Sequence, residues 1–289
     1  MVRVIDETEA DLRALIERDV GPLLSSGDFL RSLLDWLHFR ARSIPQRRRT
    51  VTMSSEVQAK LNGYPAILRI RDELSQGKDV SPWLSDTVRK KPADPKADMM
   101  FNDWQIIHFH LGNLFTGKNK VGRTSDLLFA FIAADHAVLL DVQPHGSWAM
   151  RDLLRILLRV SPNDLTRCEF KGVLGGPRNH TDDEILRLRQ AGINPILEID
   201  GRFFMAPGLG VSSSKHSTRI VRAVQTMMRN ITKARKELES NTMPKPLLRR
   251  ISQSIATPVR LGVRIEAGQL VLYDKNRNLC IMLLMPVLG

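Results

Sequence analysis

Three apolar segments in the middle of the chain most constrain how this sequence can fold. Each is short and rich in aromatic or β-branched residues, which predicts a β-strand. The last two are joined by only a few residues around Asp135 and His136, so we expect them to form a hairpin. The segments are MMFNDWQIIHFHLG, SDLLFAFIAAD and HAVLLDVQPHG, at residues 99–112, 125–135 and 136–146.

Helical spacing dominates the chain before these strands. Apolar residues recur three and four positions apart, as on one face of an α-helix, in residues 8–20, 27–42, 54–63 and 66–77. Two prolines and several charges follow, in a stretch typical of a linker. We therefore predict a helical N-terminal domain over residues 1–90, a linker over 91–98 and an α+β domain over 99–289.

The remainder of that second domain alternates helices and hairpins, which predicts an α+β fold with a mixed sheet, antiparallel hairpins and packed helices. Capping and turn residues set the expected boundaries. The expected elements are a helix after Ser147, a strand near 168–174, a helix from Thr181 to Gly192, a hairpin turning at Asp200-Gly201, a basic helix over about 217–240, a helix over 245–254, and three strands with turns at Ala267-Gly268 and near Asn276.

The first predicted strand carries two histidines in an apolar run. Side chains alternate across a strand, so His108 and His110 share one face with Trp104 and lie about 7 Å apart. His145 ends the third strand and could approach the same edge. A structural role in the core and a functional role both remain open for these histidines.

A metal site on this pair lacks the usual companions. The cupin and metallo-β-lactamase patterns need an acidic residue where this chain has Leu114 and Gly112, respectively. A carboxylate from Asp103, Asp126 or Asp141 could still complete a site of two histidines and one carboxylate. We expect no cofactor and no bound metal, with a metal-dependent hydrolase as an alternative.

Acid–base cleavage of RNA uses the same residue types without a metal. One imidazole removes a proton from a ribose 2′-hydroxyl, another protonates the leaving 5′-oxygen, and a cation stabilises the charged phosphate. Cations lie in the glycine-containing loop between the first two strands, at Lys118, Lys120 and Arg123. An ordinary solvated connection is the simpler explanation of that loop.

The succession HFHLG, a basic loop, GRTSDLLFAFIAAD and HAVLLDVQPHG resembles the central strands of the RelE and HigB toxins. These are metal-free messenger-RNA endonucleases of small α+β fold. The resemblance covers residues 101–160 and implies that Arg123 binds phosphate and that His145 transfers protons. The chain departs from the family in its length and its predicted linker. His-x-His is no signature of the family, so the roles of His108 and His110 are inferred from their chemistry.

The predicted basic helix is a second feature that favours nucleic acid. Residues 211–264 contain twelve Lys or Arg and two Glu, in a chain with a formal net charge of +12. Apolar positions recur at helical spacing, and the basic residues recur at the same spacing on roughly the opposite side of the helix. Such a stripe suits a phosphate backbone, although it is also typical of a solvated face or a membrane-surface helix. The expected contacts are Lys215, Arg219, Arg222, Arg229, Lys233 and Lys236.

The loop before that helix, FFMAPGLGVSSSKHS, has glycines and serines directly before the helix N-terminus. This geometry can bind phosphate, but the lysine of a P-loop is missing at the required spacing. A serine-capped loop is the preferred interpretation.

The composition agrees with a cytoplasmic, RNA-directed protein. The charge favours polyanions, only Cys168 and Cys280 are present, and no apolar run is long enough to span a membrane. We therefore predict a metal-independent endoribonuclease, a toxin or antiviral defence effector, that could also have an acidic inhibitory protein partner. The alternative is a nucleic-acid-binding or regulatory protein without catalytic activity.

Overall fold

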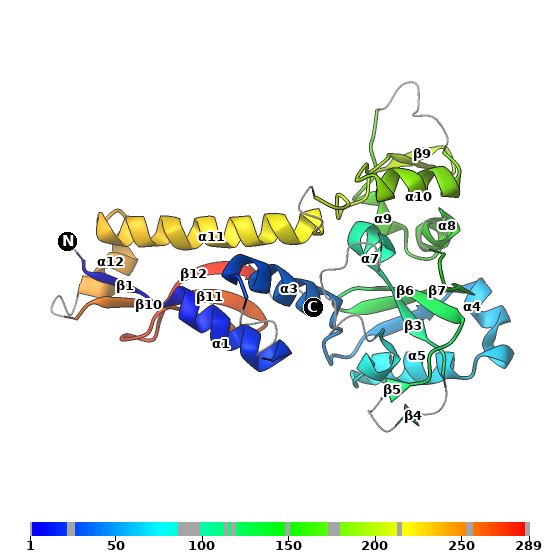
Figure 1. Ribbon diagram of the computed structural model, residues 1–289, viewed down its shortest axis with the longest axis horizontal. Coiled ribbons are helices and arrows are strands. Elements are labelled where there is room, and N and C mark those ends of the chain that lie inside the picture. Colours follow the sequence, from blue (N-terminus) through cyan, green and yellow to red (C-terminus); the bar gives the residue numbers. More distant parts are fainter. Residues whose placement is uncertain are drawn as a thin grey trace. The chain divides into compact units, whose positions relative to one another are not determined.

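The computed structural model describes residues 2–21, 27–85, 99–112, 115–116, 120–147, 151–172, 180–212, 216–252 and 257–286. The chain forms two compact units: unit 1 contains residues 1–41 and 220–288, and unit 2 contains residues 42–219. Both units combine helices with strands, many of them antiparallel, which confirms the predicted α+β class (Figure 1).

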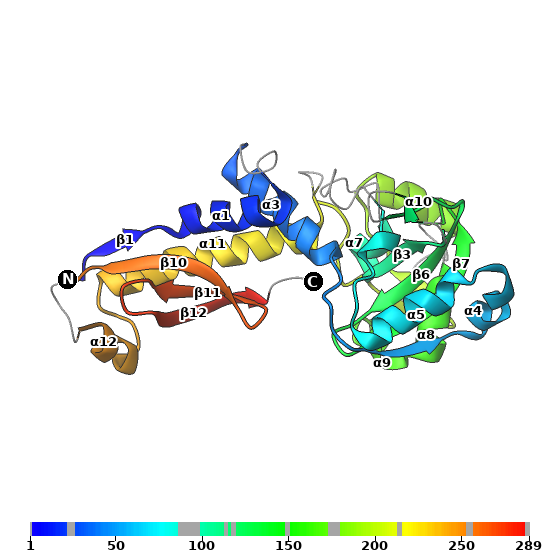
Figure 2. The ribbon, with the colours of Figure 1, turned by 90° about the horizontal axis from the view of Figure 1, so that it is seen from below.

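Unit 1 is built on a sheet whose strands come from both ends of the sequence. β1 (Val4–Asp6) is parallel to β10 (Val259–Glu266), and β11 (Gln269–Asp274) and β12 (Leu279–Pro286) continue the sheet in antiparallel order. The predicted turn between β10 and β11 is confirmed, because Ala267 and Gly268 both have positive φ. Figure 2 shows this sheet with its helices.

Among its described residues, unit 1 has four helices. They are α1 (Thr8–Val20), α3 (Phe29–Arg42), α11 (Thr218–Glu239) and α12 (Lys245–Ser252). Leu12, Trp36 and Met227 join Leu272 of the sheet in one apolar core. The helical spacing of α11 therefore predicted its buried side, which comprises Ile220, Val224, Met227, Ile231, Ala234 and Leu238.

The division of the chain differs from the one predicted. Because β1 pairs with β10, the first residues share a unit with the last strands, and the predicted 1–90 domain is split. The region that was predicted to be wholly helical also contains β1 and β2 (Thr50–Met53). The predicted linker at 91–98 lies outside the described residues.

Unit 2 contains the three predicted central strands. β3 (Ile106–His110), β6 (Asp126–Ile132) and β7 (His136–Pro144) form an antiparallel meander, and β2 pairs in parallel with β7. The first predicted strand is shorter than expected, since α7 (Met99–Trp104) precedes it and Gln105 has a φ of 61°. Trp104 therefore ends a helix and does not continue the strand of His108 and His110.

Short elements surround this sheet. The predicted helix cap at Thr181 and the predicted Asp200-Gly201 turn are confirmed, and Thr181 forms a capping box with Glu184. The strand expected near 168–174 is reduced to a single bridge between Glu169 and Phe204, and its last two residues are not described. The remaining elements of unit 2 are α4 (Ser55–Ala59), η1 (Leu61–Gly63), α5 (Ala66–Gln76), η2 (Ser81–Trp83), β4 (Phe115–Thr116), β5 (Lys120–Val121), α8 (Arg151–Val160), α9 (Pro162–Thr166), α10 (Asp182–Gln190), β8 (Leu197–Ile199) and β9 (Arg202–Phe204).

The core of unit 2 joins one sheet face to α8. Ile106, Leu127 and Phe129 of the sheet cluster with Leu153 and Leu157 of the helix. Ile106, His108 and His110 alternate onto the same side of β3. The histidine pair therefore lies on the side of the sheet that faces α8, and the other side of β3 is buried as well.

Candidate functional site at one end of the unit 2 sheet

His108 and His110 are buried residues of β3. Their exposed fractions are 8 % and 3 %, and their ring centroids lie 6.1 Å apart, close to the expected spacing. The His108 ring also lies 6.1 Å from that of Phe129, which belongs to the core. His108 is thus held among apolar side chains, whereas His110 is the last residue of the strand.

The antiparallel meander brings three of the predicted catalytic residues to one end of the sheet. The backbone N–H of Thr124 donates to Nδ1 of His110 at 3.4 Å, and the N–H of His145 donates to the carbonyl of Ser125 at 2.7 Å. Arg123 directly precedes Thr124 and is exposed, as is His145. The segments that carry His110, Arg123 and His145 therefore lie at the same end of the sheet.

The hydrogen bond from Thr124 also sets the proton position on His110. When the ring is neutral, a nitrogen that accepts a hydrogen bond carries no proton, so the proton is on Nε2. Nε2 is then the ring nitrogen that carries the proton, and it is shielded from solvent.

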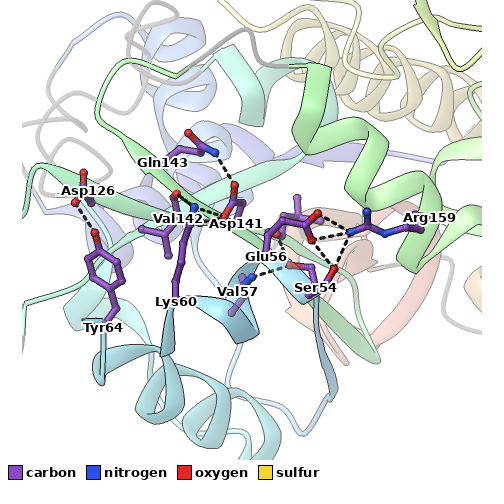
Figure 3. A network of polar contacts seen from close by, with 12 residues as sticks. Ser54, Glu56, Val57, Lys60, Tyr64, Asp126, Asp141, Val142, Gln143 and Arg159 are labelled. Atoms are coloured by element: carbon purple, nitrogen blue, oxygen red, sulfur yellow. Dashed lines mark hydrogen bonds and ion pairs between the residues drawn. The ribbon is translucent and has the colours of Figure 1, made fainter. Parts of the chain in front are cut away.

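A polar network that the sequence did not predict lies on β7 near the same end (Figure 3). The ammonium of Lys60 donates to the Asp141 carboxylate at 2.7 Å and to the Val142 carbonyl at 2.8 Å. The amide of Gln143 donates to the other oxygen of Asp141 at 2.5 Å. Asp141 is buried and Lys60 is partly exposed. The pair therefore attaches the last residues of β7 to the segment that carries Lys60.

A second contact ties the start of β6 to the segment after η1. The Tyr64 hydroxyl donates to the Asp126 carboxylate at 2.6 Å (Figure 3). This hydrogen bond raises the pKa of Tyr64 above its ordinary value, because a phenolate would face a carboxylate. Tyr64 therefore serves as a hydrogen-bond donor that holds Asp126.

The placement of Lys60 and Tyr64 follows from the helix cap after β2. Ser54 accepts a hydrogen bond from the N–H of Val57 and donates to the Leu140 carbonyl of β7. Glu56, on the first turn of α4, forms an ion pair with Arg159 of α8, which lowers the pKa of Glu56 to about 2. The segment carrying Lys60 is thus anchored to both β7 and α8.

No family model matches this chain. No curated protein and no solved structure matches it. Within the described residues, every helix is too short or too polar to span a bilayer.

The carboxylates considered as metal ligands are engaged elsewhere. Asp126 accepts from Tyr64, Asp141 pairs with Lys60, and Asp103 pairs with Arg189. In the described part of the chain, no three His, Cys, Asp or Glu residues form a group that could hold a metal ion. Sequence reasoning did not identify Lys60, Tyr64 or Gln143. The partners of Lys60 and Tyr64 are remote in the chain, and the two-residue spacing between Asp141 and Gln143 is common to many strands.

The predicted nucleic-acid contacts divide into three groups. Arg222, Arg229, Lys233 and Lys236 are exposed on α11, as predicted, and Lys120 is half-buried in β5. Lys118 and Lys215 lie outside the described residues. Arg219 was predicted to belong to the exposed basic stripe. This prediction is wrong, because its guanidinium lies over the buried ring of Phe101.

Proposed function

We propose that this protein is a metal-independent endoribonuclease that acts at the end of the β3–β6–β7 sheet, as a toxin or defence effector. The observation that carries the proposal is that the hydrogen bonds of residues 124 and 125 bring the segments carrying His110, Arg123 and His145 to one end of the sheet. Two imidazoles and a guanidinium are the groups that such a cleavage requires.

The reaction assigns one step to each group. One histidine accepts the ribose 2′-hydroxyl proton while the 2′-oxygen forms a bond to phosphorus. The phosphorus–5′-oxygen bond breaks, and the second histidine donates a proton to that oxygen. Arg123 stabilises the charge that develops on the phosphate oxygens. The products are a 2′,3′-cyclic phosphate and a 5′-hydroxyl.

The polar network supports this assignment by holding the scaffold. Asp141 and Gln143 lie four and two residues before His145, and Lys60 anchors both the Asp141 side chain and the Val142 carbonyl. Tyr64 fixes Asp126, which pairs with Pro144 across the sheet. Positioning side chains of this kind reduce the motion of the catalytic groups.

The decisive test is incubation of the purified protein with end-labelled RNA in excess EDTA. We expect fragments that end in a 2′,3′-cyclic phosphate. Cleavage that EDTA abolishes and divalent metal restores would instead favour a metal-dependent hydrolase. RNA that stays intact under both conditions, in trials that vary the substrate sequence, would contradict the nuclease proposal.

A second candidate function, nucleic-acid binding without catalysis, rests on the exposed side of α11. Arg222, Arg229 and Lys236 lie there, and none of them forms an ion pair with a described residue. Lys233 and Arg235 of the same helix do form ion pairs, with Glu237 and Asp6. Three unneutralised cations along one helix favour contact with phosphates.

Neutralising this stripe should change the salt dependence of RNA binding. We expect the combined change Arg222→Gln, Arg229→Gln and Lys236→Gln to reduce the slope of log K against log salt by roughly 2 to 3. The reason is that a phosphate that the protein no longer contacts keeps its counterion. Fluorescence anisotropy at several salt concentrations measures the slope. Arg13→Gln on α1, where Arg13 is paired with Glu9, is the matched control. An unchanged slope in the triple variant would exclude α11 as the contact surface.

A further inference from the structure

His136, the first residue of β7, holds its imidazole between two carboxylates. Nδ1 of the ring lies 2.8 Å from the Asp135 carboxylate, and Nε2 lies 2.7 Å from the Asp164 carboxylate. An ionised carboxylate only accepts hydrogen bonds, and a neutral imidazole has a single N–H to donate. Both contacts are therefore hydrogen bonds at the same time only when the ring is the doubly protonated imidazolium.

The two carboxylates differ in how they are held. The Asp164 side chain on α9 is 11 % exposed, and it also accepts a hydrogen bond from the Ser161 hydroxyl at 2.6 Å. The Asp135 side chain is 89 % exposed and belongs to the turn between β6 and β7. Asp164 is therefore the fixed partner of the ring, whereas Asp135 can exchange the ring for water.

The contacts of His136 join three segments of unit 2. Its carbonyl accepts a hydrogen bond from the Ala133 N–H at 2.9 Å, which closes the turn between β6 and β7. The Thr50 N–H donates to the Asp135 carbonyl at 2.9 Å, which attaches the start of β2 to that turn. Through the imidazole and Asp164, α9 becomes the third segment.

The elements packed around the start of β7 present few free charges to the ring. Directly before β2, the Arg49 guanidinium donates to three backbone carbonyls. On α8, the last basic residue, Arg159, forms an ion pair with Glu56 of α4. β6 contributes the uncharged ring of Phe131, whose centroid lies 6.2 Å away. Within the described residues, the charged side chains that contact His136 are thus the two carboxylates.

We infer that His136 is a pH-sensitive latch, which fastens α9 to the β6–β7 turn while the ring is protonated and loosens when the ring loses a proton. The neutral ring has one donor, which Asp164 retains because Asp135 is exposed to water. The attachment of α9 is then a single hydrogen bond without ion pairing, which is weaker. The latch does not depend on RNA cleavage, since β7 runs from His136 to Pro144 and its other end leads to the proposed catalytic site.

The direction of the pH effect follows from the same contacts. The hydrogen bond to Asp164 raises the pKa of His136 above its ordinary value of 6.5; burial opposes this change, and the hydrogen bond to Asp135 adds to it. The folded chain therefore holds the proton more tightly than the unfolded chain does. The latch contributes fully below pH 6.5 and is lost as the pH rises through the raised pKa of His136.

An NMR titration of the histidine side chains in the full protein tests the protonation of the ring. The imidazole resonance that disappears in His136→Gln identifies His136. We expect its midpoint to lie above that of an ordinary histidine, and Asp164→Asn should lower the midpoint more than Asp135→Asn does. Asp183→Asn, which changes an exposed carboxylate of α10, is the matched control and should leave the midpoint unchanged. An ordinary midpoint, or one that Asp164→Asn does not lower, would overturn the inference.

Hydrogen exchange of the backbone amides of α9 and of the β6–β7 turn tests the latch itself. After correction for base-catalysed exchange, protection should fall about two- to fivefold between about pH 6 and pH 9, the effect of losing one partly exposed ion pair. His136→Gln keeps a donor but no charge, so its protection should be low at both pH values. Should His136→Gln fail to fold, Asp164→Asn takes its place with the same expected result. Protection that depends on pH equally in the original chain and in a folded variant would show that His136 is no latch.

Discussion

Replacement of His145 by alanine is expected to lower the rate of RNA cleavage by about 100- to 10,000-fold, the usual contribution of a general acid or base. His145 is exposed and is attached to Ser125 through its backbone, so removal of its imidazole should leave the fold and the affinity for RNA unchanged. Single-turnover kinetics with excess protein separate the rate of cleavage from binding. Cleavage at the original rate would contradict the proposed mechanism.

His110 needs a different substitution because it is buried. His110→Asn retains an oxygen that can accept the Thr124 N–H in place of Nδ1, but it removes the titratable ring. We expect this variant to fold and to lose cleavage to the same degree. Full activity would assign His110 a structural role only. His180→Ala, a histidine change before α10, is the control and should cleave normally.

Arg123→Ala should reduce cleavage by about 100- to 1,000-fold, as the loss of one group that stabilises a charged transition state does. Arg123→Lys, which keeps the charge but loses the planar fork, should recover only part of the rate. An effect on affinity alone, with an unchanged rate for bound RNA, would instead place Arg123 in substrate binding.

The substitution with the largest expected effect on stability is Arg189→Met. Arg189 and Asp103 have side-chain exposed fractions of 6 % and 4 %, and they form an ion pair within unit 2. Burial raises the pKa of Asp103, and the charge of Arg189 opposes this effect. Removal of the arginine leaves a buried carboxylate without its counter-charge, which should lower the free energy of unfolding by about 3 to 5 kcal/mol.

Urea unfolding followed by circular dichroism measures this loss. Arg187→Met is the control on the same helix, since Arg187 is exposed, and it should change stability by no more than about 0.5 kcal/mol. Removing both charges, with Asp103→Asn and Arg189→Met, should cost less than Arg189→Met alone. If the single and double variants are equally stable, the pair does not interact as the structure indicates.

The sequence predicted the features that depend on neighbouring residues. Spacing of apolar residues identified the buried side of α11, Thr181 was identified as a helix cap, and the turns at Asp200 and Ala267 were placed correctly. The strand order of β6 and β7 followed from their short connection. These signals are local, because a cap or a tight turn involves only a few consecutive residues.

Features that depend on distant residues were missed. The apolar run beginning at Met99 was taken as strand, but packing selects a helix as far as Trp104. Lys60 lies 81 residues before Asp141, so no spacing could connect them. Arg219 follows the rhythm of the basic stripe, yet its guanidinium lies over the ring of Phe101. Each error arises from a contact that pattern alone does not encode.

The pairing of β1 with β10 imposes an order on folding during synthesis. Val4 is paired with Val259, 255 positions later, so at about 5 to 20 residues per second the ribosome completes β10 roughly 10 to 50 seconds after β1. All four strands of the unit 2 sheet lie between residues 50 and 144 and emerge earlier. Until β10 is complete, apolar side chains of α1 and α3, such as Leu12 and Trp36, therefore lack the sheet against which they pack. A stop codon before residue 259 would leave β1 permanently without its partner strand.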